Sequence, residues 1–110
     1  MSQVTTHVLD SALGIPAPSV GVLLEVITSD GWVAVGEGET DTDGRIGELG
    51  PDSLDDGWYR LTFATEGYFT RSGRETFYPE VSITFAVTTA DHYHVPLLLS
   101  PFGYTTYRGS

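Results

Sequence analysis

The stretch that decides the fold is VSITFAV at residues 81–87. Every second residue from Val81 to Val87 is large and apolar, whereas the residues between them are small or polar. Because successive side chains of a strand point to opposite faces, this period of two predicts a strand with one buried face. Residues 58–63, WYRLTF, repeat the pattern and predict a second half-buried strand.

Outside these segments, further short runs have the composition of strands. They lie at residues 4–9, 23–28, 32–35, 46–49, 92–98 and 104–107. Glycine, proline and aspartate punctuate the intervals, and Ser29-Asp30-Gly31 is expected to connect a hairpin. Only residues 64–72 lack alternation, and they are expected to form a turn or two of helix. About eight short strands at regular spacing predict an all-β sandwich, with residues 1–110 as a single domain.

The composition excludes several kinds of partner and chemistry. The chain has 15 acidic and 5 basic residues, a formal net charge of −10, which argues against nucleic acid and anionic membranes as partners. It has no cysteine, which excludes disulfides, thiolate metal sites and a cysteine nucleophile. No apolar run approaches the roughly 20 residues of a membrane span, and the first residues lack the pattern of a secretory signal. We therefore expect a cytoplasmic protein.

The end of the chain concentrates polar chemistry. The sequence Tyr107-Arg108-Gly109-Ser110 follows an apolar segment, residues 95–104, that is expected to be packed. Terminal residues usually fray unless something holds them. An aromatic ring, a guanidinium and a terminal carboxylate at the end of a packed segment therefore indicate a site.

The three histidines are the natural acid–base candidates, since an imidazole titrates near pH 6.5. His7 lies within the first expected strand. If Tyr93 and every second residue after it point into the core, His92 and His94 share the outer face, which suits an interface or the lip of a pocket. Each histidine alone is more typical of a surface or structural residue. With His7 as a third ligand the spacing also allows a zinc site, although such spacing is a weak signal.

Arg45 follows the acidic turn Asp41-Thr42-Asp43-Gly44. In a structural interpretation, the carboxylates of this turn pair with the arginine. A calcium loop is not expected, because the EF-hand pattern requires a later glutamate and flanking helices. In a functional interpretation, the planar guanidinium binds a flat, carbonyl-rich or anionic ligand. The residues alone thus indicate a β-sandwich with a polar site of histidine, arginine and tyrosine.

Motifs spread along the chain resemble those of the transthyretin-related 5-hydroxyisourate hydrolases, enzymes of urate breakdown in purine degradation. They are THVLD at 6–10, TDGR at 42–45, FYPEV at 77–81, HYHVPLLLSP at 92–101 and YRGS at 107–110. The resemblance covers nearly the whole chain, and the terminal tetrapeptide is the signature of the family. Transthyretin, a hormone carrier on the same fold, lacks that tetrapeptide and the matching histidines and arginine.

The resemblance implies a transthyretin-like two-sheet sandwich of about eight strands with one short helix. It also implies a homotetramer, in which strand edges pair into dimers and two dimers face each other across a channel that holds the active sites. The implied reaction is hydrolysis of a ring amide of 5-hydroxyisourate to 2-oxo-4-hydroxy-4-carboxy-5-ureidoimidazoline. No metal and no organic cofactor is implied.

The same resemblance implies roles for particular residues. The matching positions in this chain are His7, Arg45, His94, Tyr107, Arg108 and Ser110. One histidine takes a proton from the attacking water and the other assists the departing nitrogen, with a mild preference for His94 as the base. Arg45 orients the substrate and stabilises charge on the carbonyl oxygen, and the terminal tetrapeptide binds or positions substrate. His92 is interpreted as a supporting or surface residue.

Two other functions remain open at this point. A transthyretin-like carrier would hold a flat ligand without turning it over, and an accessory β-sandwich would serve a larger protein. The polar histidines and arginine argue against an apolar ligand channel, and the lack of linkers argues against an accessory role. Fold alone does not choose among these functions.

Overall fold

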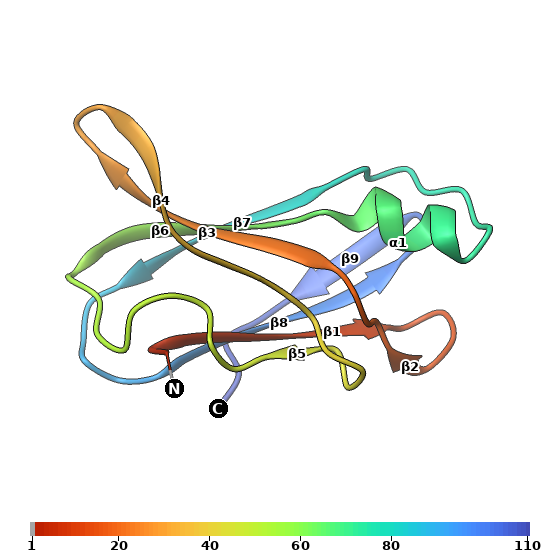
Figure 1. Cartoon of the computed structure of the whole chain (residues 1–110), viewed down its shortest axis with the longest axis horizontal. Helices are drawn as coiled ribbons and strands as arrows, with labels where there is room; N and C mark the ends of the chain where they lie inside the picture. Colours follow the sequence, from red (N-terminus) through yellow and green to blue (C-terminus); the bar gives the residue numbers. More distant parts are fainter. Residues whose placement is uncertain (1) are drawn as a thin grey trace.

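Two β-sheets stacked face to face make up the computed structural model, which describes residues 2–110 (Figure 1). One sheet has the strand order β2-β1-β8-β9, with β5 also paired to β1, and the other has the order β4-β3-β6-β7. The elements are β1 (Val4–Asp10), β2 (Ile15–Pro16), β3 (Gly21–Thr28), β4 (Gly31–Glu39), β5 (Arg45–Ile46), β6 (Gly57–Phe63), α1 (Thr65–Arg71), β7 (Val81–Val87), β8 (Tyr93–Ser100) and β9 (Gly103–Thr106). The all-β sandwich with one short helix is confirmed. The extra strand beyond the expected eight is β2, which pairs with the end of β1.

The core lies between the sheets and follows the predicted alternation. In β6, Leu61 and Phe63 are fully buried, whereas Trp58 is 62% exposed on the opposite face. Each such buried side chain stabilises the fold by about 1.5–3 kcal/mol. Both sheets contribute to this core, since Val8 of β1 and Leu97 of β8 are also fully buried, and the outer face of their sheet carries the polar residues.

The helix expected within residues 64–72 is confirmed as α1, which closes one end of the sandwich. The Tyr68 hydroxyl donates to the buried carboxylate of Asp10 on β1 at 2.8 Å, and Arg74 Nη2 donates to the same oxygen at 2.6 Å. Burial alone would raise the pKa of Asp10, but the hydrogen bonds from Arg74 and Tyr68 outweigh it and hold the pKa below its usual value. This buried cluster ties the helical segment to β1.

The strand expected at residues 46–49 is wrong beyond its first residue. The β5 strand ends at Ile46, because Leu49 turns into the core and its N–H donates to Ser2 Oγ at 2.8 Å instead of joining a ladder. The expected strand at 92–98 is confirmed except at its start, since β8 begins at Tyr93. Within residues 2–110, no helix has the length and apolar character that crossing a membrane requires.

Register brings the polar residues together. The parallel strands β1 and β8 pair Thr5 with His94 and His7 with Pro96. The short β5 pairs antiparallel with β1 and sets Arg45 opposite His7. Because directly paired residues share a face, all of these side chains lie on the face of the sheet that points away from the core.

The last residues continue along β8 beyond the end of β9. Gly109 forms an antiparallel bridge with His94, and its N–H donates to the His94 carbonyl at 2.8 Å. Figure 1 shows the chain end leaving β9 and emerging below the sheet that contains β1. The C-terminus is therefore held beside β8, as its sequence predicts for a packed terminus.

Candidate functional site

A hollow of ≈ 250 Å³ lies on the outer face of the sheet. It is lined by Thr5, Thr6, Arg45, Ile46, Gly47, His92, His94 and Ser110. These residues come from β1, β5, the start of β8 and the end of the chain. The hollow thus unites segments that are distant in the sequence but adjacent in the sheet.

His94 is half-buried in this hollow and hydrogen-bonded on one side of its ring. Its Nδ1 lies 2.8 Å from Thr5 Oγ1, which leaves Nε2 as the nitrogen available to a water or ligand. Burial lowers the pKa of His94, and the nearby His92, His7 and Arg45 lower it further. The imidazole is therefore neutral at neutral pH and able to accept a proton.

His7 stands beside the hollow, opposite Arg45. Its Nε2–H donates to the carbonyl oxygen of Asp43 at 2.9 Å. A carbonyl only accepts hydrogen bonds, so Nε2 carries the hydrogen, and Nδ1 holds a lone pair whenever the ring is neutral. The backbone of the acidic turn thereby selects the tautomer of this histidine.

The acidic turn before Arg45 is held together by hydrogen bonds from its backbone to the Asp41 carboxylate. Asp41 Oδ1 accepts the backbone N–H groups of Asp43 at 2.8 Å and of Arg45 at 3.0 Å. These backbone hydrogen bonds lower the pKa of Asp41. At Gly44, φ is +75° and an added Cβ would lie 2.3 Å from the Val8 carbonyl, so the turn requires glycine.

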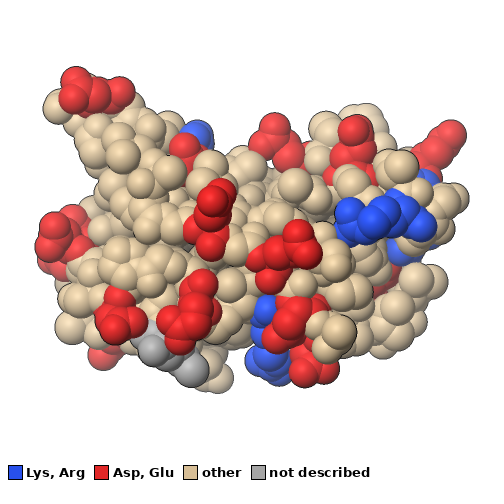
Figure 2. Space-filling view, viewed as in Figure 1, with Lys and Arg blue, Asp and Glu red and all other residues tan. Residues whose placement is uncertain are grey.

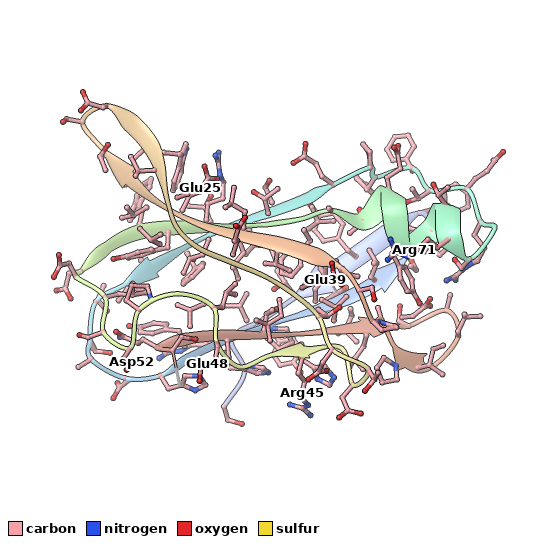
Figure 3. The ribbon with its side chains drawn as sticks, viewed as in Figure 1. Glu25, Glu39, Arg45, Glu48, Asp52 and Arg71 are labelled. Carbon is pink, nitrogen blue, oxygen red and sulfur yellow. The ribbon has the colours of Figure 1, made fainter. Side chains whose placement is uncertain are left out.

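The Arg45 guanidinium is exposed. Among the described residues, the arginines that form ion pairs with Glu25 and Asp10 are Arg60 and Arg74, and Arg45 takes part in neither pair. The predicted pairing of the turn carboxylates with Arg45 is therefore replaced by carboxylate-to-backbone bonds. Figure 3 shows Arg45 projecting from the lower side of the molecule, where its donors face solvent or a ligand.

The terminal tetrapeptide divides between two hollows. Ser110 lines the hollow that contains His94. Tyr107 and Arg108 line a second hollow of ≈ 180 Å³, in which the Arg108 guanidinium lies 4.3 Å from the centre of the Tyr93 ring. Of the predicted site residues, the structure thus brings together His7, Arg45, His94 and Ser110, and it sets Tyr107 and Arg108 apart from them within one chain.

Gly109 is packed flat against the imidazole of His94. An added Cβ would lie 2.6 Å from His94 Cδ2 and 3.3 Å from Pro96 Cγ. Real Cβ atoms essentially never approach so closely, so this position accepts only glycine unless the ring moves. Gly109 holds His94 in place from one side.

Two residues that the sequence did not single out for the site also lie here. His92 lines the hollow, and its Nε2 lies 2.9 Å from Thr5 Oγ1. The rings of His92 and His94 are 6.3 Å apart and nearly parallel, and both reach the same hydroxyl. The register of β1 against β8 would have revealed Thr5, but the sequence carries no signal for that register.

Residues 2–110 contain no group of three or more histidines and carboxylates arranged to hold a metal ion.

Comparisons with known proteins agree with the fold and the motifs. The model of the HIUase/Transthyretin family matches residues 4–109. A 5-hydroxyisourate hydrolase of Salmonella typhimurium is 47% identical over 108 residues, which cover 96% of this chain and 79% of that protein. The structure of Klebsiella pneumoniae 5-hydroxyisourate hydrolase has a TM-score of 0.85 and 38% identity, covering 100% of this chain and 94% of that one.

The same fold occurs in a protein that binds thyroxine. Sea bream transthyretin, solved in complex with thyroxine, has a TM-score of 0.91 and 34% identity, covering 97% of this chain and 94% of that one. The backbone alone therefore resembles both hydrolase and carrier. The sequence match is closer for the hydrolases, and the side chains of the hollow carry the argument on function.

Proposed function

Because the chain belongs to the HIUase/transthyretin family, we propose that it is a hydrolase of 5-hydroxyisourate that acts at the hollow containing His94. The observation that carries this proposal is a neutral, half-buried imidazole beside an exposed guanidinium. A neutral imidazole accepts a proton from water, and a guanidinium stabilises an oxyanion. An apolar ligand channel needs neither group.

In the proposed reaction, water attacks a ring carbonyl of the planar substrate. His94 takes a proton from that water at Nε2, and Arg45 donates hydrogen bonds to the oxygen on which negative charge develops. The bond from the carbonyl carbon to the ring nitrogen then breaks, and the departing nitrogen receives a proton with help from His7. The product is 2-oxo-4-hydroxy-4-carboxy-5-ureidoimidazoline, and the scheme uses no metal and no organic cofactor.

We also propose that the active form is a homotetramer, with active sites at the interface between two dimers. Two features of the single chain support this assembly. The edges of β7 and β9 are unpaired within their sheets, and such edges are commonly covered by another chain. Tyr107 is 55% exposed and lies apart from the hollow of its own chain, so in the proposed tetramer it would be buried by a facing chain. Residues 1–110 act as one domain in this proposal, and the cytoplasmic location stays a prediction.

The test of the function is an ultraviolet absorbance time course. We would generate 5-hydroxyisourate freshly from urate with urate oxidase, add the chelator-treated protein, and follow the decay of the intermediate. We expect faster decay than the spontaneous rate, and a loss of about 10²-fold or more in the His94→Ala variant. Glu80→Gln, an exposed change in the segment just before β7, is the control and should behave as the wild type.

A different outcome would redirect the assignment. Decay at only the spontaneous rate in the presence of a folded protein, together with saturable binding of thyroxine, would favour a carrier. Activity that returns only with added zinc would overturn the metal-independent scheme.

A further inference from the structure

The hydroxyl of Thr5 bridges two imidazoles on the floor of the hollow. Its Oγ1 lies 2.8 Å from His94 Nδ1 and 2.9 Å from His92 Nε2. Thr5 is only 6% exposed and is fixed by strand pairing directly opposite His94. The bridge is therefore part of the sheet and not a chance contact of mobile side chains.

The single hydroxyl hydrogen of Thr5 couples the tautomers of the His92 and His94 rings. A hydroxyl has one hydrogen to donate, so Thr5 cannot donate to both imidazoles. If both bonds are made and the hydroxyl hydrogen is used, one ring accepts from Thr5 and the other donates its N–H to Thr5. When His94 donates from Nδ1, its Nε2 carries the lone pair of a base, and when His94 accepts at Nδ1, its Nε2 carries a hydrogen. Thr5 and His92 thus set the form in which His94 meets the substrate.

His92 also connects the bridge to a second opening. It lines a separate hollow of ≈ 260 Å³ together with Ser2, Gln3, Asp52 and Ala90. His92 is itself exposed, whereas His94 is half-buried. A proton that reaches His92 can therefore leave to solvent without crossing the substrate.

From this arrangement we propose that Thr5 and His92 are positioning residues that form a proton relay behind His94. The proposal rests on the proposed hydrolysis, in which the oxygen of one water ends in the product acid. One proton of that water ends on the departing nitrogen. The other is released, because a carboxylic acid with a pKa of about 4 is ionised at neutral pH.

The relay removes this released proton in balanced steps. His94 takes it at Nε2 and becomes an imidazolium. The N–H bond at His94 Nδ1 breaks as a bond to Thr5 Oγ1 forms, and the original O–H bond of Thr5 breaks as an N–H bond forms at His92 Nε2. His92 then loses the proton at its other nitrogen to solvent. His94 is again a neutral ring, now with its hydrogen on Nε2. After the product leaves, His92 takes a proton from solvent at its other nitrogen, the bridge passes one proton back to His94 Nδ1, and His94 loses its Nε2 proton to water in the hollow, which restores the base.

The experiment compares variants of the whole protein in the hydrolysis assay. Thr5→Val removes the hydroxyl at nearly constant shape, and we expect kcat to fall by about 10–100-fold, as for other residues that orient a catalytic group. Thr5→Ser keeps the hydroxyl and should retain most of the activity. His92→Ala should lose a similar factor and recover part of it when imidazole is added to the buffer. Thr62→Val, which removes an exposed hydroxyl on the other sheet, is the matched control.

A second readout requires no substrate. Nitrogen-15 NMR of the His94 ring reports how much of the neutral form carries its hydrogen on Nδ1. The relay predicts that Thr5→Val and His92→Ala both change this population, whereas Thr62→Val does not. Other groups that act on His94 are His7 and Arg45, with the Ser110 carboxylate in the same hollow, and they are unchanged in these variants.

The outcomes separate the two proposals. An active wild type with kcat and His94 tautomer unchanged in folded Thr5→Val would overturn the relay and leave the hydrolase standing. An inactive wild type would count against the proposed function and remove the reaction that the relay serves. Imidazole rescue of His92→Ala combined with a shifted tautomer would support both.

Discussion

Because Gly109 has no side chain, the end of the chain can pack directly against the imidazole of His94. Any larger side chain would overlap the ring, since a Cβ there would lie 2.6 Å from Cδ2. We expect Gly109→Ala to lower kcat by about 10-fold or more, because a displacement of about 1 Å in a catalytic group costs up to about 10²-fold. The control is Gly103→Ala, where the added Cβ would have an ordinary contact at 3.7 Å. The assay and a thermal melt are read together, and a variant with normal kcat would show that the ring does not depend on Gly109.

The pH profile tests the protonation state of His94. Burial and the positive groups around it penalise the charged form, so protonation requires a pH below the ordinary value of 6.5. If His94 is the base, kcat/KM should fall on the acid side with an inflection below pH 6.5. Titration of His94 by NMR in the free protein should give the same value. An NMR value above 6.5, or an acid limb that does not track it, would argue against His94 as the base.

Single residues of the site differ in how far the sequence reveals them. Alternation alone predicts that His92 and His94 lie on an outer face, because side-chain direction in a strand is a local property. Thr5 and His92 acquire meaning only from the pairing of β1 with β8, where Thr5 and His94 are 89 residues apart, and Gly109 only from its bridge to His94. No local pattern contains those pairings, so their roles emerge only in the fold.

At the level of elements, the segment after α1 is anchored to β1 by the Arg74 bond to buried Asp10. Removing Arg74 leaves the buried Asp10 carboxylate without its counter-charge and out of reach of solvent. Breaking a buried ion pair in this way typically lowers the free energy of unfolding by about 3–5 kcal/mol. We expect Arg74→Leu to lower the free energy of unfolding by about 3 kcal/mol, measured by urea denaturation. Arg71→Leu is the control, since Arg71 makes an exposed bond to the Ser19 carbonyl. Equal stability of the two variants would contradict the anchoring role.

The same bond has a defined pH dependence. The pKa of Asp10 is lower in the folded protein than in the unfolded chain, so the unfolded state binds more protons as the pH falls. The stabilisation is complete above the ordinary value of 3.8 and is lost as the pH drops through the folded value. Without Arg74 the pKa of Asp10 in the folded variant is higher than in the wild type, since burial raises it and one lowering hydrogen bond is lost. The difference in free energy of unfolding between wild type and Arg74→Leu should therefore narrow as the pH falls, from the pH at which Asp10 of the variant is protonated down to the folded value of the wild type.

The sequence predicts an element correctly where its periodicity is local. The prediction is wrong where a tertiary contact changes the backbone. The strands at residues 58–63 and 81–87 follow from alternation, and the structure has them as β6 and β7. The segment 46–49 has the composition of a strand, but the Ser2 hydroxyl captures the Leu49 N–H and ends β5 early. The hairpin connection is one residue shorter than expected, because Gly31 already pairs with Thr28.

At the scale of the whole molecule, we expect the net charge to oppose the proposed assembly. Each chain carries a formal charge of −10, and Figure 2 shows acidic side chains spread over the visible face with few basic groups among them. Like charges on associating copies repel, and salt weakens this repulsion as the screening length falls from about 30 Å at 0.01 M to about 8 Å at 0.15 M. The proposed tetramer should therefore dissociate more readily on dilution at low ionic strength.

Sedimentation velocity at about 0.01 M and 0.15 M salt, at equal protein concentration, measures this directly. The hydrolysis assay in the same buffers should show specific activity falling in step with the tetramer, because the hollow of one chain is open where a facing dimer would close it. Salt acts in the opposite direction on direct ion pairs between subunits, so dissociation by added salt would mean that such pairs outweigh the net repulsion. A monomer with full activity at low salt would place the whole catalytic apparatus within one chain, and Tyr107 and Arg108 would then need a role outside the reaction.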